Sequence, residues 1–110
     1  MIIMPITRKF RDTVWTRAQG DARFRAAMLG EALNDLLAGD LAMGKAMLRD
    51  YVNATITFDG LAKATRIPTK SLQRMLGPRG NPTAESLFAI IKALQKSENI
   101  KLRVTTRHAA

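Results

Sequence analysis

Residues 67–83, IPTKSLQRMLGPRGNPT, combine polar and cationic side chains at helical spacing and contain no acidic residue. When Leu72 and Leu76 face inward, the opposite side of a helix over residues 69–76 carries Thr, Lys, Gln and Arg. Lysine and arginine donate to O6 and N7 of guanine, glutamine pairs with adenine, and threonine contacts the thymine methyl group. This chemistry suits a helix that reads base edges, and the simpler alternative is a solvated helix face. The residues concerned are Thr69, Lys70, Gln73 and Arg74.

Residues for catalysis are scarce. The single histidine, His108, lies two residues from the C-terminus, and the chain contains no cysteine. Neither a hydrolase triad nor a His/Cys metal site can be assembled from this set. The GPRGNP loop lacks the Lys-Ser/Thr pair of a phosphate-binding loop. We therefore expect no catalytic residues, no metal and no cofactor.

The charge is unevenly distributed along the chain. Eighteen Lys/Arg against nine Asp/Glu give a net charge of +9. The basic excess falls in residues 7–25, 57–80 and 92–107, whereas residues 26–56 carry two basic and four acidic side chains. A segregated basic surface favours a polyanion such as nucleic acid, because neutralised phosphates release counterions. An acidic protein and a membrane surface remain alternatives.

Targeting signals are not evident in the sequence. No apolar run reaches the length of a membrane span, and the opening MIIMPITRKFR places apolar residues before basic ones, the reverse of a signal peptide. The absence of cysteine is compatible with a reducing compartment. We expect a cytoplasmic protein.

Helical periodicity runs through most of the chain, so we expect an all-α fold. Residues 1–20 form a basic arm or a short helix, with Arg8, Lys9, Arg11 and Arg17 as either a DNA-reaching arm or a basic tail. Residues 21–98 form a single helical domain that opens with an antiparallel helical pair. Its expected N-caps and stop residue are Asp21, Asp40, Thr57, Thr83 and Gly39.

Several apolar side chains of the first helices should pack in the core. Leu37 and Leu41 belong to the apolar face of the helical pair, and we expect Trp15 and Met43 to be buried as well. Exposure of Trp15 and Met43 would instead indicate a protein-binding surface.

Residues 99–110 should form a short strand and a tail. Within residues 100–105, Ile, Leu and Val alternate with Lys, Arg and Thr, which is the period of an amphipathic β-strand. A lone strand is unstable, so it pairs with its copy in a dimer, pairs with another protein, or frays. We favour the dimer.

The spacing over residues 58–77 predicts two short helices that meet at a steep angle. A small residue is required where they cross, one apolar residue must be buried in the turn, and another must hold the second helix from beneath. One position departs from the helix-turn-helix pattern, because Arg66 stands where glycine is usual in a left-handed turn. That departure costs about 1–2 kcal/mol. The residues that meet the spacing are Leu61, Ala62, Ile67 and Leu72.

These features resemble the lambda-repressor-like, Xre/Cro-type helix-turn-helix domain, and more narrowly the addiction-module antidote proteins (HigA-type antitoxins). The resemblance covers about residues 20–98. It is carried by the pairs Leu61-Ala62 and Ser71-Leu72 and by the turn GNP at residues 80–82.

The resemblance implies a homodimeric repressor of its own operon that also binds a cognate toxin, typically a ribonuclease. Residues 69–76 of each copy would then read the major groove of double-stranded DNA. The alternative is a protein-interaction module whose main role is to inhibit the toxin, through residues 26–56 or the C-terminal strand. The implied base readers are Thr69, Lys70, Gln73 and Arg74, and the implied phosphate contacts are Thr57, Phe58, Arg79, Asn81 and Thr83.

Overall fold

The computed structural model describes residues 8–109, with side chains described from Asp12 onward. Within this range the chain forms six helices, which confirms the all-α class. Residues 1–7 of the expected basic arm, and the side chains of Arg8, Lys9 and Arg11, lie outside the described part. The helices are α1 (Arg8–Gly20), α2 (Ala22–Leu37), α3 (Leu41–Ala54), α4 (Thr57–Thr65), α5 (Thr69–Met75) and α6 (Ala84–Glu98).

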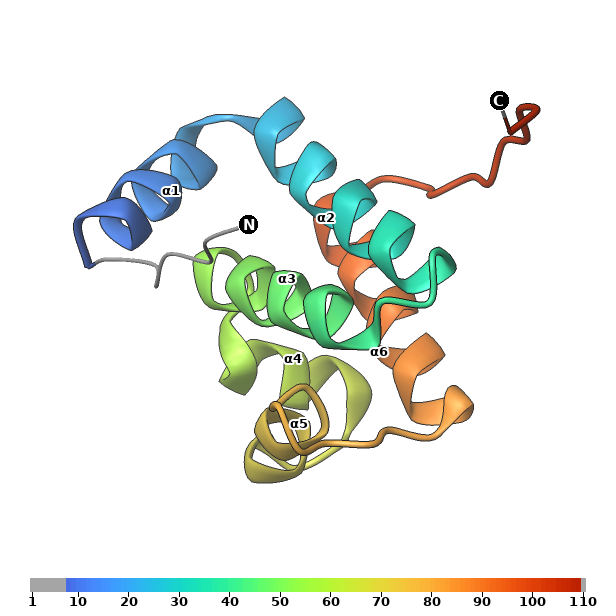
Figure 1. Cartoon of the computed structure of the whole chain (residues 1–110). Helices are drawn as coiled ribbons and strands as arrows, with labels where there is room; N and C mark the ends of the chain where they lie inside the picture. The colour runs from blue at the N-terminus through green and yellow to red at the C-terminus, as the bar shows by residue number, and fades with distance from the viewer. Residues whose placement is uncertain (1–7, 110) are drawn as a thin grey trace.

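The helical pair α2–α3 occupies the middle of the molecule (Figure 1). Residues 38–40 reverse the chain between the two helices, and α6 packs against α2 and α4. Helices α4 and α5 lie together at the end below α3, whereas α1 extends to one side. The C-terminal segment leaves α6 on the side away from α5.

The expected caps of α2, α3 and α6 are confirmed. The Asp21 carboxylate accepts from Phe24 N at 3.0 Å, and the Asp40 carboxylate accepts from Met43 N at 3.1 Å. Thr83 Oγ1 accepts from Ser86 N at 3.1 Å. Each of these bonds satisfies a backbone N–H that the first helical turn leaves free and stabilises the helix by about 1 kcal/mol.

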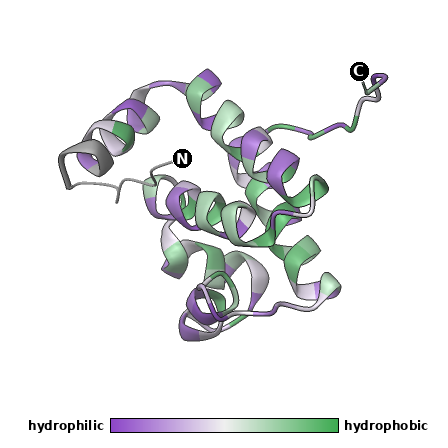
Figure 2. Ribbon diagram, in the orientation of Figure 1, coloured by the Kyte–Doolittle hydropathy of each residue, from purple (hydrophilic) through white to green (hydrophobic). Residues whose placement is uncertain are grey.

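Helices α2, α3, α4, α5 and α6 all contribute side chains to one apolar core. Figure 2 shows that α6 and much of α3 and α4 are hydrophobic, whereas the outer end of α5 is hydrophilic. The close crossing of α2 and α3 depends on Gly44, because a Cβ there would lie 2.5 Å from Cδ2 of Leu36. The largest fully buried side chains are Tyr51, Leu29, Leu48, Leu61, Leu72, Leu76, Ile90, Leu94 and Val52.

Four apolar side chains that we expected in the core are exposed. Leu37 and Leu41 are 65% and 57% exposed, and Trp15 and Met43 are 52% and 47% exposed. Leu37 is the last residue of α2 and Leu41 the first of α3, so both stand beside the exposed connection at residues 38–40. The expectation of core packing was therefore wrong at these positions.

The expected C-terminal strand is also wrong. Residues 100–109 are neither strand nor helix. The alternation of apolar and polar side chains is still visible in part, because Ile100 and Leu102 pack against the core. Leu102 N also donates to Oε1 of Gln95 at 2.8 Å. No second strand occurs in the described range, so the backbone has no ladder to join and Val104 is exposed.

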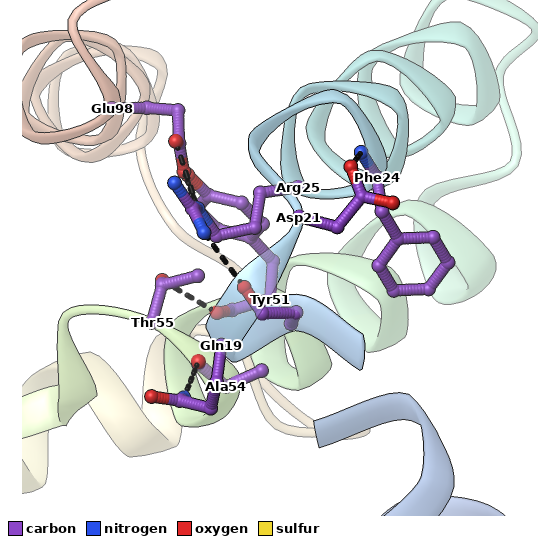
Figure 3. A network of polar contacts seen from close by, with 9 residues as sticks. Gln19, Asp21, Phe24, Arg25, Tyr51, Ala54, Thr55 and Glu98 are labelled. Atoms are coloured by element: carbon purple, nitrogen blue, oxygen red, sulfur yellow. Dashed lines mark hydrogen bonds and ion pairs between the residues drawn. The ribbon is translucent and has the colours of Figure 1, made fainter. Parts of the chain in front are cut away.

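A polar network fastens α2, α3 and α6 to one another (Figure 3). Nε of Arg25 lies 2.9 Å from Oε2 of Glu98, and the Tyr51 hydroxyl donates to Oε1 of Glu98 at 2.5 Å. Burial, with the Glu98 hydrogen bond, raises the pKa of the Tyr51 hydroxyl, which therefore stays protonated as a donor. Since the three residues come from three helices, the network fixes how these helices pack.

The end of α1 is tied to the same region. Nη1 of Arg25 donates to the backbone oxygen of Ala18, and Nε2 of Gln19 donates to that of Ala54, each at 2.8 Å. Ala18 is buried in the core, so α1 is anchored at its C-terminal end.

Candidate nucleic-acid interface

The implied phosphate contacts begin at the start of α4. Thr57 Oγ1 accepts a hydrogen bond from Gly60 N at 3.2 Å, so this exposed hydroxyl covers one free backbone donor of the first turn. Thr57 has a positive φ of 68°. The Phe58 side chain is buried in the core, which leaves only its backbone N–H for the implied phosphate contact.

The turn between α4 and α5 is left-handed at Arg66, the position that departs from the usual glycine. Arg66 has φ 61° and ψ 25°, and its N–H donates to the oxygen of Ala62 at 2.8 Å. Leu61 is fully buried, and Ile67 packs partly buried against the core. Pro68 leads directly into α5, so the chain bends sharply between the helices.

Arg66→Gly is expected to raise the free energy of unfolding by about 0.5–1 kcal/mol. Glycine relieves the steric strain of a Cβ at positive φ, and the greater freedom of glycine in the unfolded chain offsets part of that gain. Urea denaturation measures the difference. Ala27→Gly, on an exposed position inside α2, is the control and should lower stability by about 1 kcal/mol. An equal loss in both variants would contradict the strain at Arg66.

Helix α5 turns its apolar side inward and its cationic side outward. Leu72 and Leu76 are fully buried. Lys70, Gln73 and Arg74 are exposed, and in the described range no acidic group lies within ion-pair distance of Lys70 or Arg74. These donors are therefore available to an external acceptor.

Thr69 differs from the other implied base readers. It is half-exposed, and its Oγ1 donates to Oδ1 of Asp59 at 3.0 Å. The bond links the first turn of α5 to the first turn of α4 across the bend. Asp59, Lys63, Arg66 and Thr69 line a shallow hollow of about 550 Å³ beside this bond.

The loop after α5 carries the remaining implied phosphate contacts. Arg79, Asn81 and Thr83 are all exposed. Gly80 N donates to the oxygen of Gly77 at 3.0 Å, which closes the loop on itself. Thr83 also caps α6, so its hydroxyl stands at a helix N-terminus, where an anion is favoured.

Two cations that sequence reasoning missed hold this loop in place. Nζ of Lys45 donates to the oxygens of Gly77 and Gly80 at 3.2 and 2.7 Å, and Lys45 is only 9% exposed. Nη1 of Arg49 donates to the oxygen of Leu76. These oxygens lie at or just beyond the C-terminal end of α5, where the helix dipole favours positive charge.

A sequence signal for these cations did exist. Lys45 and Arg49 are the only basic residues in the net-acidic stretch 26–56, and they are four apart, so they share one face of α3. What the sequence did not supply was their acceptors, which are backbone oxygens of a distant loop.

The structure therefore gathers the implied site residues at one end of the molecule, on α4, α5 and the loop that leads to α6 (Figure 1). Comparison with protein-family models, curated proteins and solved structures gave no match. None of the described helices is both long and apolar enough to cross a membrane.

Proposed function

We propose that this protein is a sequence-specific, double-stranded DNA-binding transcriptional regulator. In this proposal α4, the turn at Arg66 and α5 form a helix-turn-helix, and α5 enters the major groove. The observation that carries it is the left-handed bend at Arg66, with Leu61 and Leu72 directed into the core and Lys70 and Arg74 directed into solvent. We further propose that the regulator is the antitoxin and autorepressor of a toxin–antitoxin module, which is what the sequence resemblance of residues 20–98 to HigA-type antitoxins implies.

The exposed side chains of α5 can reach base edges, whereas those of the loop after α5 can reach phosphates. Lys70, Gln73 and Arg74 project from the outer side of α5, where a groove-bound helix meets base edges. Arg79, Asn81 and Thr83 lie on the following loop, where a phosphate can accept from side chains and from the free N–H groups of α6. Base contacts confer sequence preference, whereas phosphate contacts confer affinity for any duplex.

A homodimer would place two copies of α5 in successive major grooves, about 34 Å apart. If each copy contacts three or four phosphates, the logarithm of affinity falls against the logarithm of salt concentration with a slope of about −5 to −7. A slope near zero would contradict binding through phosphates.

Arg74→Ala is expected to weaken binding to the preferred duplex by about 1–3 kcal/mol and to relax sequence preference, because a base-reading arginine makes paired bonds to guanine. Arg79→Ala should weaken preferred and scrambled duplexes alike. Selection from a random duplex library identifies the preferred sequence, and titration of both duplexes measures each affinity.

The control for charge alone is Lys96→Ala, an exposed cation in the last turn of α6. It should change both affinities little. Equal losses for Arg74→Ala on both duplexes would exclude base reading by Arg74. A Lys70/Arg74 double-alanine variant that still selects the original sequence would refute the proposed reading helix.

A second candidate function is protein binding through α2–α3. Leu41 and Met43 are exposed there, and both cations of α3, Lys45 and Arg49, are directed to the loop after α5. With these two cations directed to the loop, the charge that remains on residues 26–56 is acidic, which suits a basic protein such as the ribonuclease toxin that the family resemblance implies. Co-purification with a basic protein in the absence of DNA is the measurement that decides for this candidate.

A further inference from the structure

We propose that Asp59 and Thr69 form a specificity-determining pair that selects a base with an exocyclic amino group, adenine or cytosine, and weakens binding to non-specific DNA. This inference rests on the proposed DNA-binding function. It concerns an acidic residue that the base-reader and phosphate-contact assignments above leave out.

The hydrogen bond between Thr69 and Asp59 has one possible direction, because an ionised carboxylate cannot donate. Thr69 Oγ1 donates its proton to Oδ1 of Asp59 at 3.0 Å. A hydroxyl has one proton to donate and two acceptor lone pairs. With the proton committed to Asp59, the Thr69 hydroxyl offers only acceptor capacity to an incoming base.

Asp59 and Thr69 together offer acceptors and no free donor on their side chains. An ionised carboxylate only accepts hydrogen bonds, and Oδ2 of Asp59 has no donor among the described residues. Asp59 and Thr69 together therefore present acceptors and a methyl group. In the major groove adenine N6 and cytosine N4 are the donors, whereas guanine O6 and thymine O4 are acceptors that would face this oxygen-rich pair unfavourably.

The Asp59 carboxylate lies in a basic part of the chain. Asp59 is the only acidic residue in the stretch 57–80, which carries five basic residues. It is exposed and lines the same hollow as Lys63 and Arg66. A carboxylate at this place repels phosphate oxygens, so it penalises the loosely placed backbone contacts on which non-specific binding depends.

Asp59→Asn tests both consequences, because asparagine keeps a side chain of the same shape, removes the charge and adds two donors. We expect the affinity for scrambled duplex to rise about threefold to fivefold and the salt dependence to steepen. In the random-library selection, the wild-type chain should prefer adenine or cytosine at one position of each half-site, and Asp59→Asn should admit guanine or thymine there.

Two further variants separate the causes. Thr69→Val keeps the Asp59 charge and removes the hydroxyl, so it should weaken preference at that one position without raising the affinity for scrambled duplex. Glu31→Gln removes an exposed acidic charge from α2 and should leave the ratio of the two affinities within about twofold. Circular dichroism and thermal melting establish that each variant is folded.

The inference is overturned if Asp59→Asn has the same base preferences and the same affinity ratio as the wild-type chain, or if Asp59→Asn and Glu31→Gln change that ratio equally. Failure of the proposed function has a different signature, since the wild-type chain would then select no duplex and the Lys70/Arg74 double variant would bind DNA as the wild-type chain does.

Discussion

Glu98→Ala is expected to lower the free energy of unfolding by about 3 kcal/mol. Glu98 accepts from Arg25 and from the Tyr51 hydroxyl at once, and its side chain is only 7% exposed. Removing the carboxylate leaves a largely buried guanidinium without its counter-charge and a buried hydroxyl without its acceptor. Removing a negative charge from the C-terminal end of α6 also relieves a repulsion with the helix dipole, but this stabilises the protein by only about a few tenths of a kcal/mol.

Urea denaturation of Glu98→Ala can be compared with that of Arg17→Ala, which removes the exposed ion pair between Arg17 and Asp21. That pair has an N–O distance of 3.9 Å, with side chains 64% and 42% exposed, and Arg17 also stacks over Phe24. Arg17→Ala should cost under about 1 kcal/mol. Similar losses of unfolding free energy in the two variants would show that the buried Arg25–Glu98 pair stabilises the protein no more than an exposed pair does.

Elements set by neighbouring residues could be predicted from the sequence. The caps at Asp21, Asp40 and Thr83 follow from a short polar side chain placed before an apolar periodic run, and each makes the expected bond. Arg66 is left-handed at the position where the helix-turn-helix pattern usually has glycine, although the sequence itself places a non-glycine residue there.

Features that depend on distant chain could not be predicted in the same way. The periodicity of α2 and α3 identifies an apolar face, but the extent of the neighbouring helices decides whether Leu37 and Leu41 are covered. The alternation of apolar and polar residues after Asn99 likewise identifies an apolar face, but it does not show whether a second strand is present to pair with it.

In the candidate site, too, features set by neighbouring residues could be predicted, and features set by distant residues could not. The outward positions of Lys70, Gln73 and Arg74 follow from helical spacing once Leu72 is directed inward. The bond between Asp59 and Thr69, ten residues apart, requires the bend itself. The acceptors of Lys45 are backbone oxygens 32 and 35 residues away, and backbone oxygens have no signature in a sequence.

Gly80→Ala is expected to lower the free energy of unfolding by about 2–4 kcal/mol and to weaken binding to every duplex. A Cβ at Gly80 would lie 2.1 Å from the oxygen of Arg74 and 2.2 Å from that of Met75. Both atoms belong to the backbone of α5, so no side-chain rotation relieves the contact. The loop must move, and the movement breaks the 2.7 Å bond from Lys45 to the oxygen of Gly80.

Gly30→Ala is the matched control, because nothing lies within 4 Å of a Cβ built at Gly30, inside α2. There the substitution should raise stability by about 0.5–1 kcal/mol and leave DNA affinity unchanged, since alanine favours helix more than glycine does. The displaced loop of Gly80→Ala carries Arg79 and Asn81, so its DNA affinity should fall even at temperatures where the variant is fully folded. A Gly80→Ala variant as stable as the wild-type chain would mean that the loop does not pack closely against α5, and the placement of Arg79 for a phosphate would lose its support.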